Sequence, residues 1–294
     1  MKPTLSVIVI VHDMRREAPR TLFSLSPGYQ RRMETGDYEV IVVENGSSAP
    51  LSAEEVECVG PNFRYHRHET SSSSPVGAVN LGVDLARGEW VAICIDGARI
   101  LSPGILHYML AAFRAFPKPF VYTLGWHLGQ EVQNVSIETG YDQEAEDRLL
   151  ESVDWRGNGY ALFSISTLAL SCRRGWFSPV AESNCFALPK TEFVRLGGFN
   201  QAFQAAGGGL VNLDFFALAC AAPELTPVLL LGEGTFHQFH GGIATNVARA
   251  DHPWAKFHEE YVSVRGKPYS PPQFSPFFLG RLSPEARRFL SAQP

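Results

Sequence analysis

Apolar, β-branched runs alternate with segments of helical periodicity through the first 115 residues of the chain. Three of the runs, at 5–11, 38–43 and 89–95, are largely apolar, which is typical of strands covered on both faces of a parallel sheet. The expected strands lie at 5–11, 38–43, 62–66 and 89–95, and the expected helices at 16–25, at 75–86 and from residue 102. Repeated strand–helix units of this kind predict an α/β fold, with a mostly parallel central sheet and helices on both of its faces.

The second half of the chain is less regular. The expected strands there are 120–124 and 161–170, and the partly helical segments are 186–196 and 210–221. The last fifty or so residues are rich in proline and aromatic residues, which is typical of a segment that wraps around a domain. We therefore expect one domain over 1–245, with halves at 1–115 and 116–245, followed by a C-terminal tail at 246–294.

Composition and charge exclude several classes of protein. With 294 residues, 45% of them hydrophobic, the chain is not disordered. A net charge of −5 provides no basic field, so nucleic acid is not an expected partner. No apolar stretch approaches the roughly 18 residues of a membrane span, so no transmembrane segment is expected. The five cysteines form no Cys-x-x-Cys pair, which indicates reduced thiols and a cytoplasmic protein.

Polar residues gather where the expected strands end. His12 and Asp13 follow the first strand, Glu44 and Asn45 end the second, and Asp96 ends the fourth. Ligands of open α/β sheets bind at the carboxyl ends of the strands, so we expect a site there. The alternative is ordinary turn chemistry, because aspartate, asparagine and glycine cap helices and close turns in many proteins.

Taken in order, these segments resemble the family 2 glycosyltransferases of the GT-A fold. The family's second strand ends in Asp-Asn-Gly-Ser or Asp-Asp-Gly-Ser, and here residues 44–47 read Glu-Asn-Gly-Ser. Residues 77–82 and 86–90 match the family's glycine–asparagine stretch and its following Ala-x-Gly-aromatic run. Gly-Gly-Phe-Asn-Gln at 197–201 is similar to the family's Gly-Gly-Phe-Asp-Glu. The matches span roughly residues 5 to 242.

The resemblance implies a nucleotide-binding half at 1–115 and an acceptor and catalytic half at 116–245. The donor would be a nucleoside diphosphate sugar and the acceptor a glycan or another hydroxyl compound. The nucleoside would be held by His12, Asp13, Glu44 and Asn45. Gly77 and Asn80 would let the chain pass close to the diphosphate, because glycine has no side chain to collide with it; the alternative is that they only shape the start of a helix.

The family's Asp-x-Asp metal motif is incomplete in this chain. Residues 96–98 read Asp-Gly-Ala, so only Asp96 can contribute a carboxylate to Mn²⁺ or Mg²⁺. Arg99 could neutralise diphosphate charge directly, which leaves metal dependence open. A late histidine is a metal ligand in several GT-A enzymes, and His240 is favoured over its competitor His237. Because residues three apart on a strand point to opposite sides, we expect at most one of the two to face the metal.

The catalytic base should be a carboxylate that takes the proton of the acceptor hydroxyl. The family places it after the Gly-Gly-Phe segment, where Asp214 is the ionisable residue that remains; a structural ion pair is the alternative role of Asp214. Glu182 is the second candidate base. Trp126 and Trp176 are candidate platforms for a sugar ring, with a place in the core as the alternative.

The sequence therefore predicts a nucleotide-sugar-dependent glycosyltransferase of the hexosyltransferase type, acting with inversion. The alternative is a catalytically degenerate GT-A domain that binds nucleotide or glycan as a partner module. A nicotinamide-dependent oxidoreductase is excluded because residues 12–15 contain none of the glycines of a dinucleotide-binding turn. Assembly into a homo-oligomer is left open.

Overall fold

The computed structural model describes residues 2–290 and contains one ten-stranded mixed sheet. The order of the main strands is β10-β9-β6-β8-β4-β1-β2-β3, with β5 paired to β9 and β7 paired to β6. The strands are β1 (Leu5–Val11), β2 (Tyr38–Asn45), β3 (Phe63–His68), β4 (Trp90–Cys94), β5 (Arg99–Leu101), β6 (Pro119–Leu128), β7 (Ser166–Leu168), β8 (Cys185–Pro189), β9 (Thr226–His237) and β10 (Phe277–Gly280). The expected mostly parallel α/β sheet is confirmed.

The strands β4, β1, β2 and β3 are parallel neighbours. Successive residues of β1 enter two different hydrophobic clusters: Ile8 and Ile10 pack with one, Val7 and Val9 with the other. Both faces of the sheet are therefore covered, which is why the run is apolar at every position except Ser6. The helices of this half are α1 (Ala18–Ser24), α2 (Ala53–Glu57), α3 (Val76–Leu85) and α4 (Ile105–Ala115).

The strand β8 runs antiparallel to both of its neighbours, β4 and β6. It brings a distant part of the chain to the carboxyl end of β4. The amide of Ile95, just after β4, donates to the carbonyl of Asn184 at 3.3 Å. Residues that precede β8 therefore lie beside Asp96.

The second half corrects two expectations. Residues 161–170, expected as a strand, form mainly a 3-10 helix (Gly159–Ile165) followed by the short β7. An apolar run without regular alternation does not distinguish a strand from a buried helical turn. Residues 186–196 divide into β8 and the helix α7 (Lys190–Arg195), whereas 210–221 form the helix α8 (Val211–Ala221) as expected.

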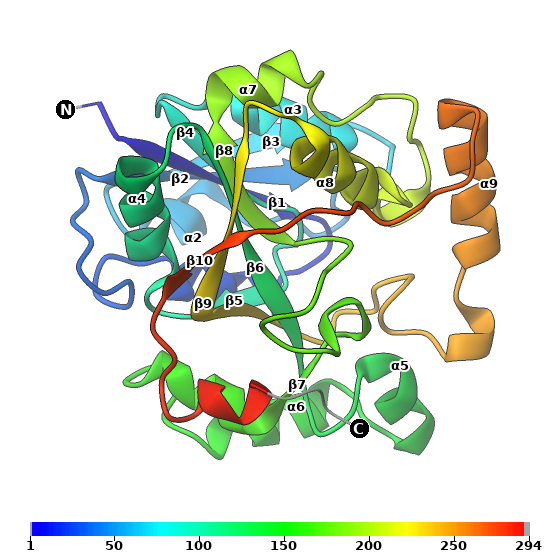
Figure 1. Cartoon of the computed structure of the whole chain (residues 1–294). Helices are drawn as coiled ribbons and strands as arrows, with labels where there is room; N and C mark the ends of the chain where they lie inside the picture. The colour runs from blue at the N-terminus through cyan, green and yellow to red at the C-terminus, as the bar shows by residue number, and fades with distance from the viewer. Residues whose placement is uncertain (1, 291–294) are drawn as a thin grey trace.

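Further helices α5 (Gln133–Ser136), α6 (Gln143–Glu151) and α9 (Trp254–Arg265) complete the chain. From α9 the chain crosses the molecule to β10, which extends the sheet beside β9 (Figure 1). Phe289 then inserts, fully buried, into the main hydrophobic cluster. The division at residue 245 stays a prediction. Within residues 2–290, no helix combines the length and the hydrophobicity that crossing a membrane requires.

Candidate active site

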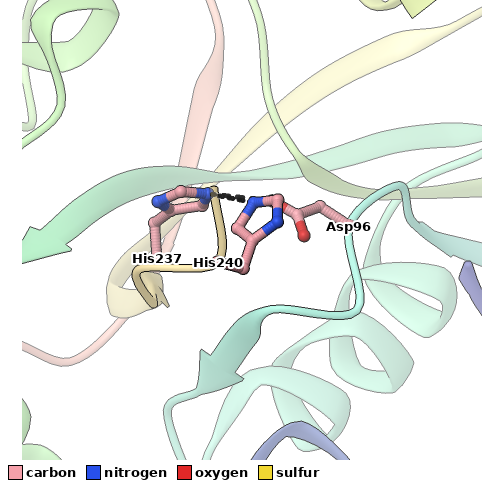
Figure 2. Close-up of side chains that lie close together, drawn as sticks. All are labelled: Asp96, His237 and His240. Atoms are coloured by element: carbon pink, nitrogen blue, oxygen red, sulfur yellow. Dashed lines mark hydrogen bonds and ion pairs between the residues drawn. The ribbon is translucent and has the colours of Figure 1, made fainter. Parts of the chain in front are cut away.

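Asp96, His237 and His240 come together at the carboxyl end of β4 and the end of β9 (Figure 2). The short strand β5 pairs antiparallel with the end of β9, and this pairing sets Arg99 opposite His237. The Oδ2 atom of Asp96 lies 3.1 Å from Nε2 of His237 and 3.9 Å from Nε2 of His240. The two histidine Nε2 atoms are 3.2 Å apart. One carboxylate and two imidazoles therefore face a common point.

His237 is held in place by a buried amide network. Its Nδ1 lies 2.6 Å from Oε1 of Gln133, while Nε2 of Gln133 donates to the carbonyl of His237 at 3.1 Å. The Nδ2 group of Asn246 also donates to that Gln133 oxygen, at 2.9 Å. Burial lowers the pKa of His237 to about 4, so the ring is neutral near pH 7. Its Nδ1 carries the proton that Gln133 accepts, and Nε2 is left with a lone pair.

The expectation that His237 and His240 point to opposite sides is wrong. Alternation of side chains holds along a continuous strand, but β9 ends at His237. The chain then bends, and the amide of His240 donates to Oδ1 of Asn246 at 3.1 Å. This turn brings His240 back onto the side that His237 occupies.

Arg99 is a buried cation beside this cluster. It is 4% exposed, and its Nε lies 3.4 Å from Oδ2 of Asp96. Neither Nε nor Nη1 of Arg99 has a hydrogen-bond partner among the described residues. Burial alone would raise the pKa of Asp96, but His240, His237 and Arg99 together hold that pKa well below its usual value. Asp96 is therefore a carboxylate at neutral pH.

The predicted nucleoside residues lie at the ends of β1 and β2, close to this loop. Nδ1 of His12 lies 2.6 Å from the carbonyl of Asn45, and Oδ1 of Asp13 accepts from the amide of Ser48 at 2.7 Å. The carboxylate of Glu44, 1% exposed, accepts from the amide of Leu51 at 2.9 Å and from the Ser47 hydroxyl. These bonds fix the turn after β2, and the roles of the four residues toward a nucleoside stay predictions.

A backbone hydrogen bond links the loop that carries Asp96 to the end of β1. The amide of Gly97 donates to the carbonyl of Ile10 at 2.7 Å. A Cβ atom at Gly97 would lie 2.8 Å from that same oxygen, so the glycine permits the contact. The loop that carries Asp96 is thereby attached to the end of β1, two residues before His12.

Gly77 and Asn80 make contacts inside the protein. The amide of Asn80 bonds the backbone of Phe199 twice: Nδ2 donates to the carbonyl at 2.8 Å and Oδ1 accepts from the N–H at 3.0 Å. These bonds join α3 to the Gly-Gly-Phe segment. A Cβ atom at Gly77 would lie 2.8 Å from Cε1 of His68, so the helix start packs closely on β3. A role toward the diphosphate stays a prediction for both residues.

The two candidate bases have different surroundings. Both carboxylate oxygens of Asp214 accept from Arg265, at 2.7 Å from Nε and 2.5 Å from Nη2. Glu182 accepts one bond, from Nδ2 of Asn212 at 3.2 Å. The same Asn212 group lies 3.4 Å from Oδ1 of Asn184, the residue whose carbonyl bonds the chain beside Asp96. Glu182 is thus anchored near the end of β4, whereas Asp214 is engaged in an ion pair.

The expectation that Trp126 and Trp176 form sugar platforms is wrong. Both side chains are 0% exposed, and their ring centroids are 5.1 Å apart. They belong to the aromatic core between the sheet and the 3-10 helix at 159–165. A stacking platform must present a ring face to the ligand, and these faces are covered.

Sequence reasoning missed Gln133, which orients His237, and Asn212, which bonds Glu182. Nothing in the local pattern marks Gln133, because its partner lies 104 positions away. Asn212 does carry a signal, since it and Asp214 are polar residues in the otherwise apolar helix α8.

Comparisons with known proteins agree with this architecture. Residues 6–149 match the sequence family described as Glycosyl transferase family 2. No curated protein matches the chain. Among solved structures, residues 1–349 of TarS from S. aureus in complex with UDP-GlcNAc superpose with a TM-score of 0.55 and 13% identity, covering 89% of this chain and 65% of that one. The same TarS fragment without that ligand gives a TM-score of 0.52 and 13% identity, covering 80% and 60%.

The chain thus spans less than two thirds of the length of these TarS fragments. At this level of identity the likeness shows the fold, and the expected GT-A architecture is confirmed.

Proposed function

We propose that the protein moves a hexose from a nucleoside diphosphate sugar to a hydroxyl acceptor, with inversion, because residues 6–149 match the glycosyl transferase family 2 model. The observation that carries this proposal is the cluster of Asp96, Arg99 and two histidines at the carboxyl ends of the strands. Ligands of α/β sheets bind at this edge. Two buried nitrogens of Arg99, Nε and Nη1, have no hydrogen-bond partner within residues 2–290, and an anionic ligand would satisfy them.

UDP-GlcNAc is the first donor to test, because it is the ligand in the TarS complex with the same fold. In our proposal, His12, Asp13, Glu44 and Asn45 hold the nucleoside. Gly77 and Asn80 border the path of the diphosphate. Arg99 binds the phosphate oxygens through its free guanidinium N–H groups, which favour bidentate contacts with such oxygens.

Asp96 and His240 would hold a divalent ion, Mn²⁺ or Mg²⁺. Their donor atoms fit this role, because with His237 they form the one group of three clustered metal-binding side chains among residues 2–290. When bound, such an ion stabilises negative charge on the diphosphate that leaves. The protein's own contribution is to hold Asp96 ionised and to fix the His237 ring by its bond to Gln133.

Glu182 is the better candidate for the base that accepts the proton of the acceptor hydroxyl. Its single bond from Asn212 leaves lone pairs of the carboxylate free, and Asn184 anchors this segment beside Asp96. Asp214 would first have to break two bonds to Arg265. General-base catalysis requires a carboxylate within hydrogen-bond reach of the reacting hydroxyl, so the segment before β8 should border the acceptor.

In this proposal, the half at 1–115 binds the donor and the half at 116–245 binds the acceptor. Five free cysteines, three of them buried, suit the cytoplasmic location that we propose.

The alternative function, a degenerate GT-A domain that binds nucleotide or glycan, is favoured by Ala98 in place of a carboxylate and by the ion pair of Asp214.

One experiment tests the proposal against this alternative. The protein is incubated with UDP-GlcNAc and other nucleoside diphosphate sugars in the presence of Mn²⁺, and the released nucleoside diphosphate is measured, with water as the acceptor. Binding is followed in parallel by the shift in melting temperature. Release of one nucleotide supports the transferase. Stabilisation by a nucleotide without any release supports the degenerate module, and no response to any nucleotide contradicts both.

A further inference from the structure

We infer that His237 takes the place of the missing second carboxylate, so that Asp96, His237 and His240 form a two-histidine, one-carboxylate site that binds Zn²⁺, Co²⁺ or Mn²⁺ in preference to Mg²⁺. This inference rests on the proposed function in one respect, which is that the bound ion would hold the donor diphosphate. Its basis is the arrangement of the donor atoms themselves.

The first observation is the direction of the lone pair of His237. Gln133 is fixed by two bonds, one to the carbonyl of His237 and one from Asn246. Its Oε1 atom therefore accepts from Nδ1 of His237. Nε2 is left pointing at the Asp96 carboxylate, 3.1 Å away. The His237 lone pair and the Asp96 carboxylate therefore face the same space, where one cation could be bound by both.

The second observation is the spacing of the three donor atoms. They are separated by 3.1, 3.2 and 3.9 Å. Metal–nitrogen bonds of about 2.0–2.1 Å place ligand atoms about 3–3.5 Å apart around a single ion. The hydroxyl of Thr245 also lies near Nε2 of His237, at 3.5 Å. The three donors are therefore arranged for one ion, and three protein ligands leave an open position for a phosphate oxygen.

The third observation concerns the kind of ion. Mg²⁺ takes oxygen ligands in a near-octahedral arrangement, and this group supplies one carboxylate. Imidazole nitrogens suit the transition metals, whose affinity for such sites rises from Mn²⁺ through Co²⁺ toward Zn²⁺. The bond from Nδ1 of His237 to Gln133 is the outer contact that ligating histidines usually make, and it fixes both tautomer and ring orientation. Replacing a carboxylate by this histidine shifts the preference away from Mg²⁺.

The test measures metal binding without any nucleotide. The full-length protein is freed of metal with a chelator and titrated with Co²⁺, whose visible absorption reports nitrogen ligation, and Zn²⁺, Mn²⁺ and Mg²⁺ are compared by calorimetry. We expect Co²⁺ and Zn²⁺ to bind more than about 100-fold more tightly than Mg²⁺. His237→Gln should weaken Co²⁺ binding by more than about 100-fold, and Gln133→Leu by about 10–100-fold. His107→Gln on α4 is the matched control and should bind Co²⁺ as the unchanged protein does.

Equal affinity for Mg²⁺ and Co²⁺ in the unchanged protein would overturn the inference, and this comparison needs no variant to fold. A Co²⁺ spectrum that His237→Gln leaves intact would overturn it as well, provided that the variant melts as a folded protein. The two proposals fail separately. Tight Co²⁺ binding without donor turnover would refute the transferase alone, whereas donor turnover in a protein that binds no Co²⁺ would refute the metal site alone.

Discussion

Exchanging each candidate base for its amide separates catalysis from structure. Glu182→Gln removes the proton acceptor but keeps an oxygen that can accept from Asn212, so the fold should be unaffected. We expect kcat to fall by about 10²–10⁴, the usual contribution of general-base catalysis. Affinity for the donor should change little, because the acceptor side of the site is altered.

Asp214→Asn should act on stability instead. The Asp214 side chain is 5% exposed and that of Arg265 is 29% exposed. Breaking a fully buried pair costs about 3–5 kcal/mol, and the partial exposure of Arg265 reduces our expectation to about 2–3 kcal/mol. For a chain of this size the melting temperature should fall by about 3–5 °C. The kcat of the folded variant should remain near normal.

Both quantities are measured on each purified variant: release of nucleoside diphosphate well below the melting temperature, and the thermal midpoint itself. Arg265→Gln serves as the control, since it leaves the more deeply buried Asp214 carboxylate unpaired and should lower the midpoint more than Asp214→Asn does. A fully active Glu182→Gln enzyme, together with a stable but inactive Asp214→Asn enzyme, would refute the reasoning and return the base to Asp214.

Three further changes have defined outcomes. Arg99→Gln should weaken binding of UDP more than binding of uridine, as measured by calorimetry, because its free N–H groups are assigned to the phosphates; equal losses would remove that assignment. Burial raises the pKa of Glu233 to about 7 from its ordinary 4.5, so the folded state binds the proton more tightly than the unfolded state. Relative to Glu233→Gln, the free energy of unfolding measured in urea should therefore fall by up to about 3 kcal/mol as pH rises from about 4.5 to about 7, and a constant difference would contradict this. Gly234→Ala would place a Cβ atom 2.1 Å from the fully buried Trp126 ring and should cost about 1–3 kcal/mol or more, whereas Gly28→Ala, with no atom within 4 Å, should melt almost unchanged.

The parallel half of the fold could be predicted because its strands are buried on both faces. Each of β1, β2 and β4 is then an apolar run that is visible without any knowledge of its neighbours. The insertion of β8 between β4 and β6 could not be predicted in this way, since the pairing of Cys94 with Cys185 joins residues that are 91 positions apart. The local sequence pattern indicates which strands are buried, whereas the order of the strands depends on contacts between distant parts of the chain.

The same limit applies to the site. Asp96, Arg99 and His240 could be proposed from the sequence because they lie in or beside segments that match family motifs in order. The joint placement of His237 and His240 was missed, because it depends on where β9 ends and how the chain bends afterwards. The ion pair of Asp214 involves Arg265, 51 positions away on α9, and no local signal indicates it.

The changed motif would couple the charge of Arg99 to binding of the proposed metal ion. The family's two carboxylates would bring two negative charges to the ion, whereas here Asp96 is a single carboxylate beside the buried Arg99 cation, 3.4 Å away. A metal ion bound without nucleotide is therefore repelled by Arg99, whereas a diphosphate is attracted by both the ion and Arg99. Arg99→Gln should consequently bind Co²⁺ more tightly than the unchanged protein when no nucleotide is present, while it binds UDP more weakly. If Arg99 had only a structural role, its replacement would weaken binding of both Co²⁺ and UDP. Weaker binding of both ligands would therefore refute this electrostatic account of the site.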